Sequence, residues 1–212
     1  MEYKEVRDVI AAIIILGLII SLVYPLKINL ALFPKFLFFA LLIIGINILA
    51  KKIIAFSLDA DIEHETWKWS RYGLKPHQHF KTEIPLGIIL SVILSLFSLG
   101  FVKFMSLLTY ETRARKIRAA KRFGFYSFTE MTDWHNGLIG ASGIVALLLL
   151  SLVTYFISPD DVLWRFSAYY AFWNMLPISK LDGTQIFFGS KILYSALGII
   201  TLIFTVYALV LP

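Results

Sequence analysis

The stretch NMLPISKLDGTQIFFGSK, residues 174–191, places Asp182 between two apolar segments of a very apolar chain. An ionised carboxylate inside the apolar zone of a membrane costs several kcal/mol unless it is paired or faces a polar cavity. One interpretation is a Leu-Asp-Gly turn at the membrane surface, in which Gly183 supplies a positive φ. The other is that Asp182 has a charged partner inside the protein, which the rest of the chain has to supply.

The composition indicates a membrane protein. The chain has 212 residues, of which 58% are hydrophobic and 16% are charged, whereas a typical soluble domain has about 25% charged residues. Uncharged runs at 9–26, 84–102, 137–158 and 192–212 are each about as long as the roughly 20 residues that a spanning helix needs. We therefore expect an all-α polytopic protein of the cell membrane, multi-pass and surrounded by the lipid bilayer.

These runs, together with two shorter ones, predict about six membrane segments. The segments are expected at 6–26, 30–58, 84–109, 137–158, 163–180 and 190–211. Polar stretches at 59–83 and 110–136 separate some of them, and a small strand element is expected within 59–83. Because the chain contains no internal repeat and no low-complexity linker, we treat residues 1–212 as a single membrane-embedded domain.

The segment 84–109 has two interpretations. As a full span, it places the polar stretch 59–83 outside the cell and the polar stretch 110–136, which contains a basic cluster, inside. As a re-entrant hairpin, it leaves both polar stretches inside. Pro85, Gly87 and Gly100 suit such a broken element where protein shields it from lipid. Hydropathy alone favours the full span.

One cluster of basic residues is the main source of the net charge of +6. Its members are Arg113, Arg115, Lys116, Arg118, Lys121 and Arg122. A basic cluster beside a span marks the cytoplasmic side and attracts anionic lipid, and we expect no nucleic-acid partner. The chain has no cysteine, which excludes disulfides and thiol chemistry.

Residues 174–194 resemble the signature of the site-2 protease family, which consists of intramembrane zinc metalloproteases, and above all its archaeal-type members. In that family an Asn-x-x-Pro-x-x-x-Leu-Asp-Gly stretch carries the third zinc ligand, which here would be Asp182. A His-Glu-x-x-His helix supplies the other two ligands, and its glutamate is the general base. The stretch NILAKKIIAFSLDADIEHETWKW, 47–69, aligns with that helix and its continuation if Asn47 and Lys51 stand at the histidine positions and Ile48 at the glutamate.

The departures from the family pattern predict a loss of catalysis. Both histidines and the glutamate are absent, Ile48 cannot act as a base, and the cationic Lys51 would repel zinc. The family's Ala-Gly-Pro-x-x-Asn stretch resembles SGIVAL, 142–147, in which isoleucine and leucine replace the proline and the asparagine. The resemblance therefore implies a pseudoprotease without zinc or another cofactor. Such a pseudoenzyme would bind membrane segments or other membrane proteins in its vestigial active-site cleft.

The vestigial site is expected to contain an ion pair. In a family-like fold position 51 and Asp182 converge, so we expect Lys51 to pair with Asp182 and Asn47 to add a hydrogen bond. The alternative is that Lys51 and Lys52 mark a helix end and extend to the lipid headgroups. Convergence also favours re-entrance of 84–109, with the N-terminus in the cytoplasm. The residues assigned to the site are Asn47, Ile48, Lys51, Asn174, Asp182 and Gly183.

Two other functions stay open. An active intramembrane zinc metalloprotease would need displaced ligands, for which the candidates are His64, His77, His79 and Asp182. Alternate residues of an extended HQH stretch point the same way and could share a metal, although the stretch reads equally well as an interfacial loop. The second is a transporter or channel subunit, but the membrane segments contain few ionisable residues for an ion path.

Overall fold

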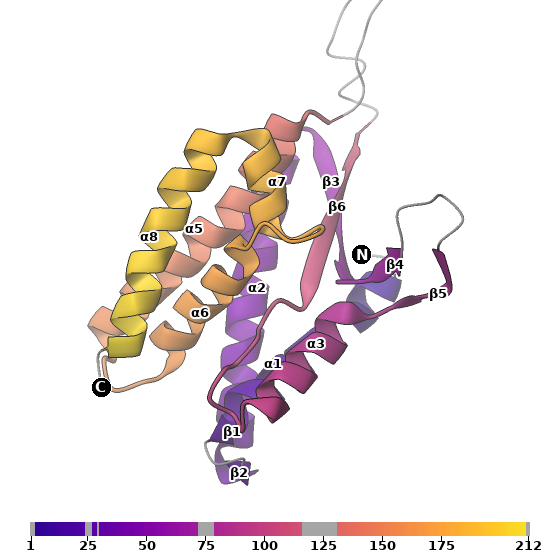
Figure 1. The fold of residues 1–212 in the computed structure, drawn as a ribbon. Coiled ribbons are helices and arrows are strands. Elements are labelled where there is room, and N and C mark those ends of the chain that lie inside the picture. Colours follow the sequence, from indigo (N-terminus) through magenta and orange to yellow (C-terminus); the bar gives the residue numbers. More distant parts are fainter. Residues whose placement is uncertain (1–2, 24–26, 29, 72–78, 116–130, 211–212) are drawn as a thin grey trace, which may run out of the picture. The chain divides into compact units, whose positions relative to one another are not determined.

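The structure is a computed structural model that describes residues 3–23, 27–28, 30–71, 79–115 and 131–210 (Figure 1). In chain order the elements are α1 (Tyr3–Ser21), β1 (Leu22–Val23), β2 (Lys27–Ile28), the 3-10 turn η1 (Leu30–Leu32), α2 (Phe33–Ser57), β3 (Ala60–Thr66), β4 (Trp69–Arg71), β5 (His79–Ile84), α3 (Leu86–Phe97), β6 (Leu108–Ala114), α5 (Asp133–Ile157), α6 (Leu163–Met175), α7 (Asp182–Gly189) and α8 (Lys191–Val210). The chain divides into two compact units. Unit 1 consists of Met1–Ala40 and His64–Thr109, and unit 2 of Leu41–Glu63 and Tyr110–Pro212. The single domain expected over 1–212 stays a prediction.

Most of the described chain is helical, and three of the described helices are long and apolar enough to cross a membrane. They are α2, α5 and α8. A helix of 25 residues such as α2 or α5 is about 38 Å long at 1.5 Å per residue, which exceeds the roughly 30 Å of a bilayer's hydrocarbon core. These three helices confirm the coarse prediction of a helical protein suited to a membrane.

The expectation of an all-α protein is wrong in detail, because strands also form. The strands expected within 59–83 are present as β3, β4 and the start of β5. However, β6 occupies 108–114 with the sequence LTYETRA, where a membrane segment was expected to end. Threonine and tyrosine favour the extended backbone, and β6 pairs with β3.

Only part of the segment 84–109 is helical. The 12 residues of α3 extend about 18 Å, well short of the roughly 30 Å hydrocarbon core. Leu99 and Gly100 then have positive φ values of 56° and 84°, and the Ser98 hydroxyl accepts a hydrogen bond from Val102 N at 3.0 Å. A continuous spanning helix over 84–109 is therefore wrong, while re-entrance stays a prediction.

In unit 1, the first turns of α1 bind the end of β3 through two buried carboxylates. Oδ2 of Asp8 accepts hydrogen bonds from Thr66 Oγ1 at 2.8 Å and Thr66 N at 3.2 Å. Oε1 of Glu5 lies 3.3 Å from Nδ1 of His64. Charged residues thus occupy the start of α1, where an apolar membrane segment was expected from residue 6 onwards.

In unit 2, glycines on α5 allow close packing against α7. A Cβ atom on Gly137 would lie 3.2 Å from Gln185 O, and one on Gly140 would lie 3.4 Å from Asp182 O. Helix α5 also packs against α6, and α8 packs against α6 and α7 (Figure 1). The small α5 residues therefore bring the start of α7, with Asp182, onto the surface of α5.

Candidate functional site

The candidate site is a buried ion pair within unit 2. Nζ of Lys51 on α2 donates a hydrogen bond to Oδ1 of Asp182 at 2.8 Å and lies 2.7 Å from Oδ2. The Lys51 side chain is 3% exposed and the Asp182 side chain 0%. The predicted pair is present, and Lys51 does not extend to lipid headgroups.

The ammonium of Lys51 has two further neighbours that fit a cation. It lies 4.8 Å from the centroid of the Tyr110 ring on β6, a cation–π distance. The Tyr110 hydroxyl donates to Asn136 O at 2.7 Å, which holds the ring against the first turn of α5. Gly143 leaves the space for Lys51, since a Cβ there would lie 2.5 Å from Lys51 Cε.

Asp182 is positioned by the turn between α6 and α7. Leu181 is extended, with φ −64° and ψ 162°, and Asp182 opens α7, where the helix dipole stabilises a negative charge. Gly183 is helical, its φ is not positive, and Asp182 is buried, so the alternative of a turn at the membrane surface is wrong. The glycine is needed because a Cβ there would overlap the backbone carbonyl of Met175.

Asn47 and Ile48 lie near the pair but do not complete it. Asn47 is 4% exposed, and its Nδ2 lies 2.7 Å from the position of a Cβ on Gly143. This nitrogen is buried with no hydrogen-bond acceptor among the residues that the structure describes. The expected hydrogen bond from Asn47 to the pair is therefore absent from the described contacts. Ile48 is 7% exposed and contributes an apolar side chain.

Asn174 is buried in unit 2, but its amide bonds within its own helix. Its Nδ2 donates to Tyr170 O, one turn earlier in α6, at 2.8 Å. Asn174 therefore has a local structural contact in place of a direct contact with the ion pair.

A polar pocket of about 250 Å³ lies between β6, the start of α5 and the α6–α7 turn. It shares Tyr110 with the ion-pair site. Its lining residues are Tyr110, Glu111, Thr112, Asn136, Lys180 and Gln185. Across its mouth, Nζ of Lys180 lies 2.7 Å from Oε1 of Glu111, and both side chains are well exposed. The pocket can therefore offer a cation, an anion and neutral polar groups to a ligand, whereas the ion pair itself is closed to solvent.

The displaced zinc ligands are not assembled among the described residues. His64 belongs to unit 1, where its ring lies against Glu5. His77 lies outside the described residues, and His79 begins β5. Within the described ranges, no group of three His, Cys, Asp or Glu side chains is placed to hold a metal ion. The displaced-ligand site stays a prediction.

The two described members of the basic cluster are paired with acids of β3. Arg113 Nη1 lies 3.0 Å from Glu63 Oε1, and Arg115 Nε donates to Asp61 Oδ1 at 2.8 Å. This hydrogen bond from Arg115 lowers the pKa of the Asp61 carboxyl below its ordinary value. The other members, Lys116, Arg118, Lys121 and Arg122, lie outside the described residues.

Sequence reasoning missed Tyr110, which contributes the aromatic face below Lys51. No linear pattern singled it out, because its contact depends on β6 packing against α5. Comparison of the chain with protein-family models, with curated proteins and with solved structures finds no match.

Proposed function

We propose that the chain is a catalytically inactive, site-2 protease-like membrane protein that binds membrane segments or partner proteins. The observation that carries this proposal is the ion pair between Lys51 and Asp182. The resemblance to the protease family assigns both positions to zinc ligands. In this chain the Lys51 ammonium stands 2.7 Å from the carboxylate that would otherwise bind the metal.

The donor set at these positions does not fit a zinc site. An ammonium has three donors and no lone pair, so Lys51 cannot coordinate a metal while it pairs with Asp182. Ile48 has no ionisable group, which leaves the glutamate position without a general base. Asn47, the third position, offers only an amide. The proposal therefore assigns no hydrolytic step to these residues.

The proposed binding region is the polar pocket next to the pair. The ion pair fills its own space, so a partner has to contact the surface beside it. Lys180 and Glu111 satisfy one another at the pocket mouth, and an exposed pair of this kind contributes at most about 1 kcal/mol. A partner with polar or charged groups next to its membrane segment can therefore displace this pair at low cost.

The proposed topology has about six membrane segments, with the N-terminus in the cytoplasm and 84–109 re-entrant. The short α3 and the break at Leu99 and Gly100 support it. This topology would keep α2 and α7 at matching depths, as the contact between Lys51 and Asp182 requires.

Elemental analysis of the purified full-length chain, before and after mild chelation, tests the absence of catalysis. We expect far less than one zinc per chain. Near-stoichiometric zinc that is lost on Asp182→Ala would contradict the proposal and support an active metalloprotease with displaced ligands. Ion flux in vesicles that contain the chain would instead support a transporter or channel.

Binding is tested separately with a labelled apolar peptide that has the length of a membrane span and charged ends. Energy transfer to the labelled chain in vesicles reports the association. Gln185→Trp fills the polar pocket and should weaken binding several-fold. Ser195→Trp, on an exposed face of α8, adds the same side chain away from the pocket and should not. Equal binding by both variants would exclude this pocket as the binding region.

A further inference from the structure

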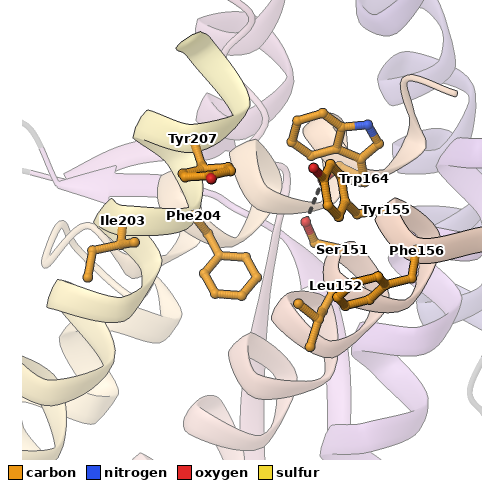
Figure 2. A pocket seen from close by; sticks show the side chains of 8 residues that line it. All are labelled: Ser151, Leu152, Tyr155, Phe156, Trp164, Ile203, Phe204 and Tyr207. Atoms are coloured by element: carbon orange, nitrogen blue, oxygen red, sulfur yellow. Dashed lines mark hydrogen bonds between the residues drawn. The ribbon is translucent and has the colours of Figure 1, made fainter. Parts of the chain in front are cut away.

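A second cavity in unit 2 lies between the end of α5, the start of α6 and the end of α8 (Figure 2). Its volume is about 220 Å³. In Figure 2, Phe204 and Tyr207 of α8 face Tyr155 of α5 and Trp164 of α6 across an open space. The groove thus has two aromatic walls contributed by different helices.

The surface of the groove is almost entirely apolar. Hydroxyl groups occur on Ser151, Tyr155 and Tyr207, and that of Ser151 is already used, since Oγ donates to Trp164 O at 2.8 Å. Leu152, Phe156 and Ile203 complete the lining with apolar side chains. A ligand of matching chemistry is therefore a hydrocarbon. An apolar protein cavity of about 150 Å³ is enough to bind benzene, so this groove has room for several methylene groups.

The position of the groove identifies the source of the hydrocarbon. It lies between α5 and α8, two of the helices that are apolar enough to span a membrane. Its outer lining residues are strongly exposed: Phe156 is 76% exposed and Ile203 is 55% exposed. In a bilayer these side chains face lipid chains rather than water.

Arg165 follows Trp164 in α6 and adds a charged group next to the Trp164 ring, which lines the groove. Its guanidinium lies 5.1 Å from the ring of Trp164. Its buried Nε has no hydrogen-bond acceptor among the residues that the structure describes. Arg165 also lies in the first turn of α6, where free backbone N–H groups favour an anion. The loop just before α6 contains Asp160 and Asp161, and charged residues of this kind favour the membrane–water interface over the bilayer core.

We propose that the groove binds one hydrocarbon chain of a membrane phospholipid and that Arg165 binds its phosphate. The apolar walls hold the chain, and the guanidinium of Arg165 supplies the complementary charge. Asp160 and Asp161, in the loop before α6, would repel further negative charge. A headgroup with a single phosphate therefore fits the surroundings of Arg165 better than one with several.

Fluorescence quenching by bromine-labelled lipid chains tests the proposal on the full-length chain. The signal is the difference in tryptophan fluorescence between the unaltered protein and Trp164→Phe, which gives the emission of the tryptophan in the groove. Titration with brominated phosphatidylglycerol, an anionic lipid with a single phosphate, in mixed micelles should give saturable quenching. Brominated diacylglycerol has the same chains without the phosphate and should need about fivefold higher concentrations, the effect of one basic side chain at an anionic lipid surface.

Variants test the role of Arg165 independently. Arg165→Gln should raise the phospholipid concentration for half-quenching about fivefold, and Arg165→Lys should restore most of the binding. Lys191→Gln, which removes an exposed cation from the start of α8, is the matched control and should change nothing. Inorganic phosphate should not displace the lipid, because it lacks the chain.

Three outcomes would overturn the proposal. The first is quenching that rises in proportion to lipid without saturation, as ordinary contact with bulk lipid would produce. The second is equal binding of phospholipid and diacylglycerol by the unaltered protein, a comparison that needs no folded variant. The third is displacement by inorganic phosphate alone, which would mean a simple anion site.

Discussion

Replacement of Lys51 by methionine tests the buried ion pair. Methionine keeps an unbranched apolar side chain but removes the ammonium, so Asp182 loses its counter-charge. Because the Asp182 side chain is 0% exposed, solvent cannot screen the remaining charge. Removal of one partner from a buried pair costs about 3–5 kcal/mol, a large share of a total stability of roughly 5–15 kcal/mol.

Proton uptake by Asp182 sets an upper limit to this loss. To protonate a carboxyl with an ordinary pKa of about 3.9 at pH 7 costs about 4 kcal/mol, since each pH unit is worth about 1.4 kcal/mol. The loss caused by Lys51→Met should therefore approach about 4 kcal/mol at pH 7 and shrink by about 1.4 kcal/mol per unit towards pH 4. The sign follows because the folded variant then binds a proton that the unfolded chain has released.

The assay is unfolding of the purified chain in mixed micelles, followed by circular dichroism. It compares Lys51→Met, Asp182→Asn and the double variant with the unaltered protein. Lys51→Met combined with Asp182→Asn leaves no buried charge and should recover part of the loss, leaving a cost of about 1–3 kcal/mol from the unsatisfied amide. Lys52→Met makes the same change at a partly exposed neighbour and should cost no more than about 1 kcal/mol. An unchanged midpoint for Lys51→Met, or a double-variant loss equal to the sum of the single losses, would refute the buried pair.

Other predictions concern glycines and the β3–β6 ion pair. Gly143→Ala should destabilise the chain by about 1–3 kcal/mol, because its Cβ would lie 2.5 Å from a side-chain carbon of α2. Gly45→Ala should be neutral or stabilise by up to about 1 kcal/mol, because nothing lies within 4 Å of its Cβ; the same unfolding assay compares the two. Gly183→Ala should be more disruptive than Gly143→Ala, since a backbone carbonyl cannot move aside as a side chain can, and a lower expression yield and unfolding midpoint would show it. The hydrogen bond from Arg115 lowers the pKa of the Asp61 carboxyl from its ordinary value of 3.8. The ionised carboxyl therefore stabilises the folded protein above about pH 4, and this contribution is lost as the pH falls through the folded-state pKa. Since Asp61 is 60% exposed, this should be only a few tenths of a kcal/mol; an NMR titration of its carboxyl that shows an ordinary pKa would contradict the pairing.

Apolar runs alone located α2, α5 and α8 to within a few residues. A spanning helix is specified locally, because its backbone hydrogen bonds are internal and its side chains need only be apolar over about 20 residues. The same reasoning overestimated α3. The run 84–102 is apolar, but the helix ends at Phe97, just before the turn at Leu99 and Gly100. The average hydropathy of a run contains no information about backbone turns within it.

The position of Asp182 between apolar segments left two interpretations, a turn at the membrane surface or a charged partner inside the protein. The resemblance to a known motif then selected Lys51, 131 residues away. Only the tertiary structure decided the rest of the site. The Tyr110 ring beside the ammonium, the Asn47 Nδ2 without an acceptor among the described residues and the close approach at Gly183 depend on which faces of α2, α5, α7 and β6 meet. Such contacts arise from packing between segments far apart in the chain, and neither the composition nor the periodicity of one segment contains them.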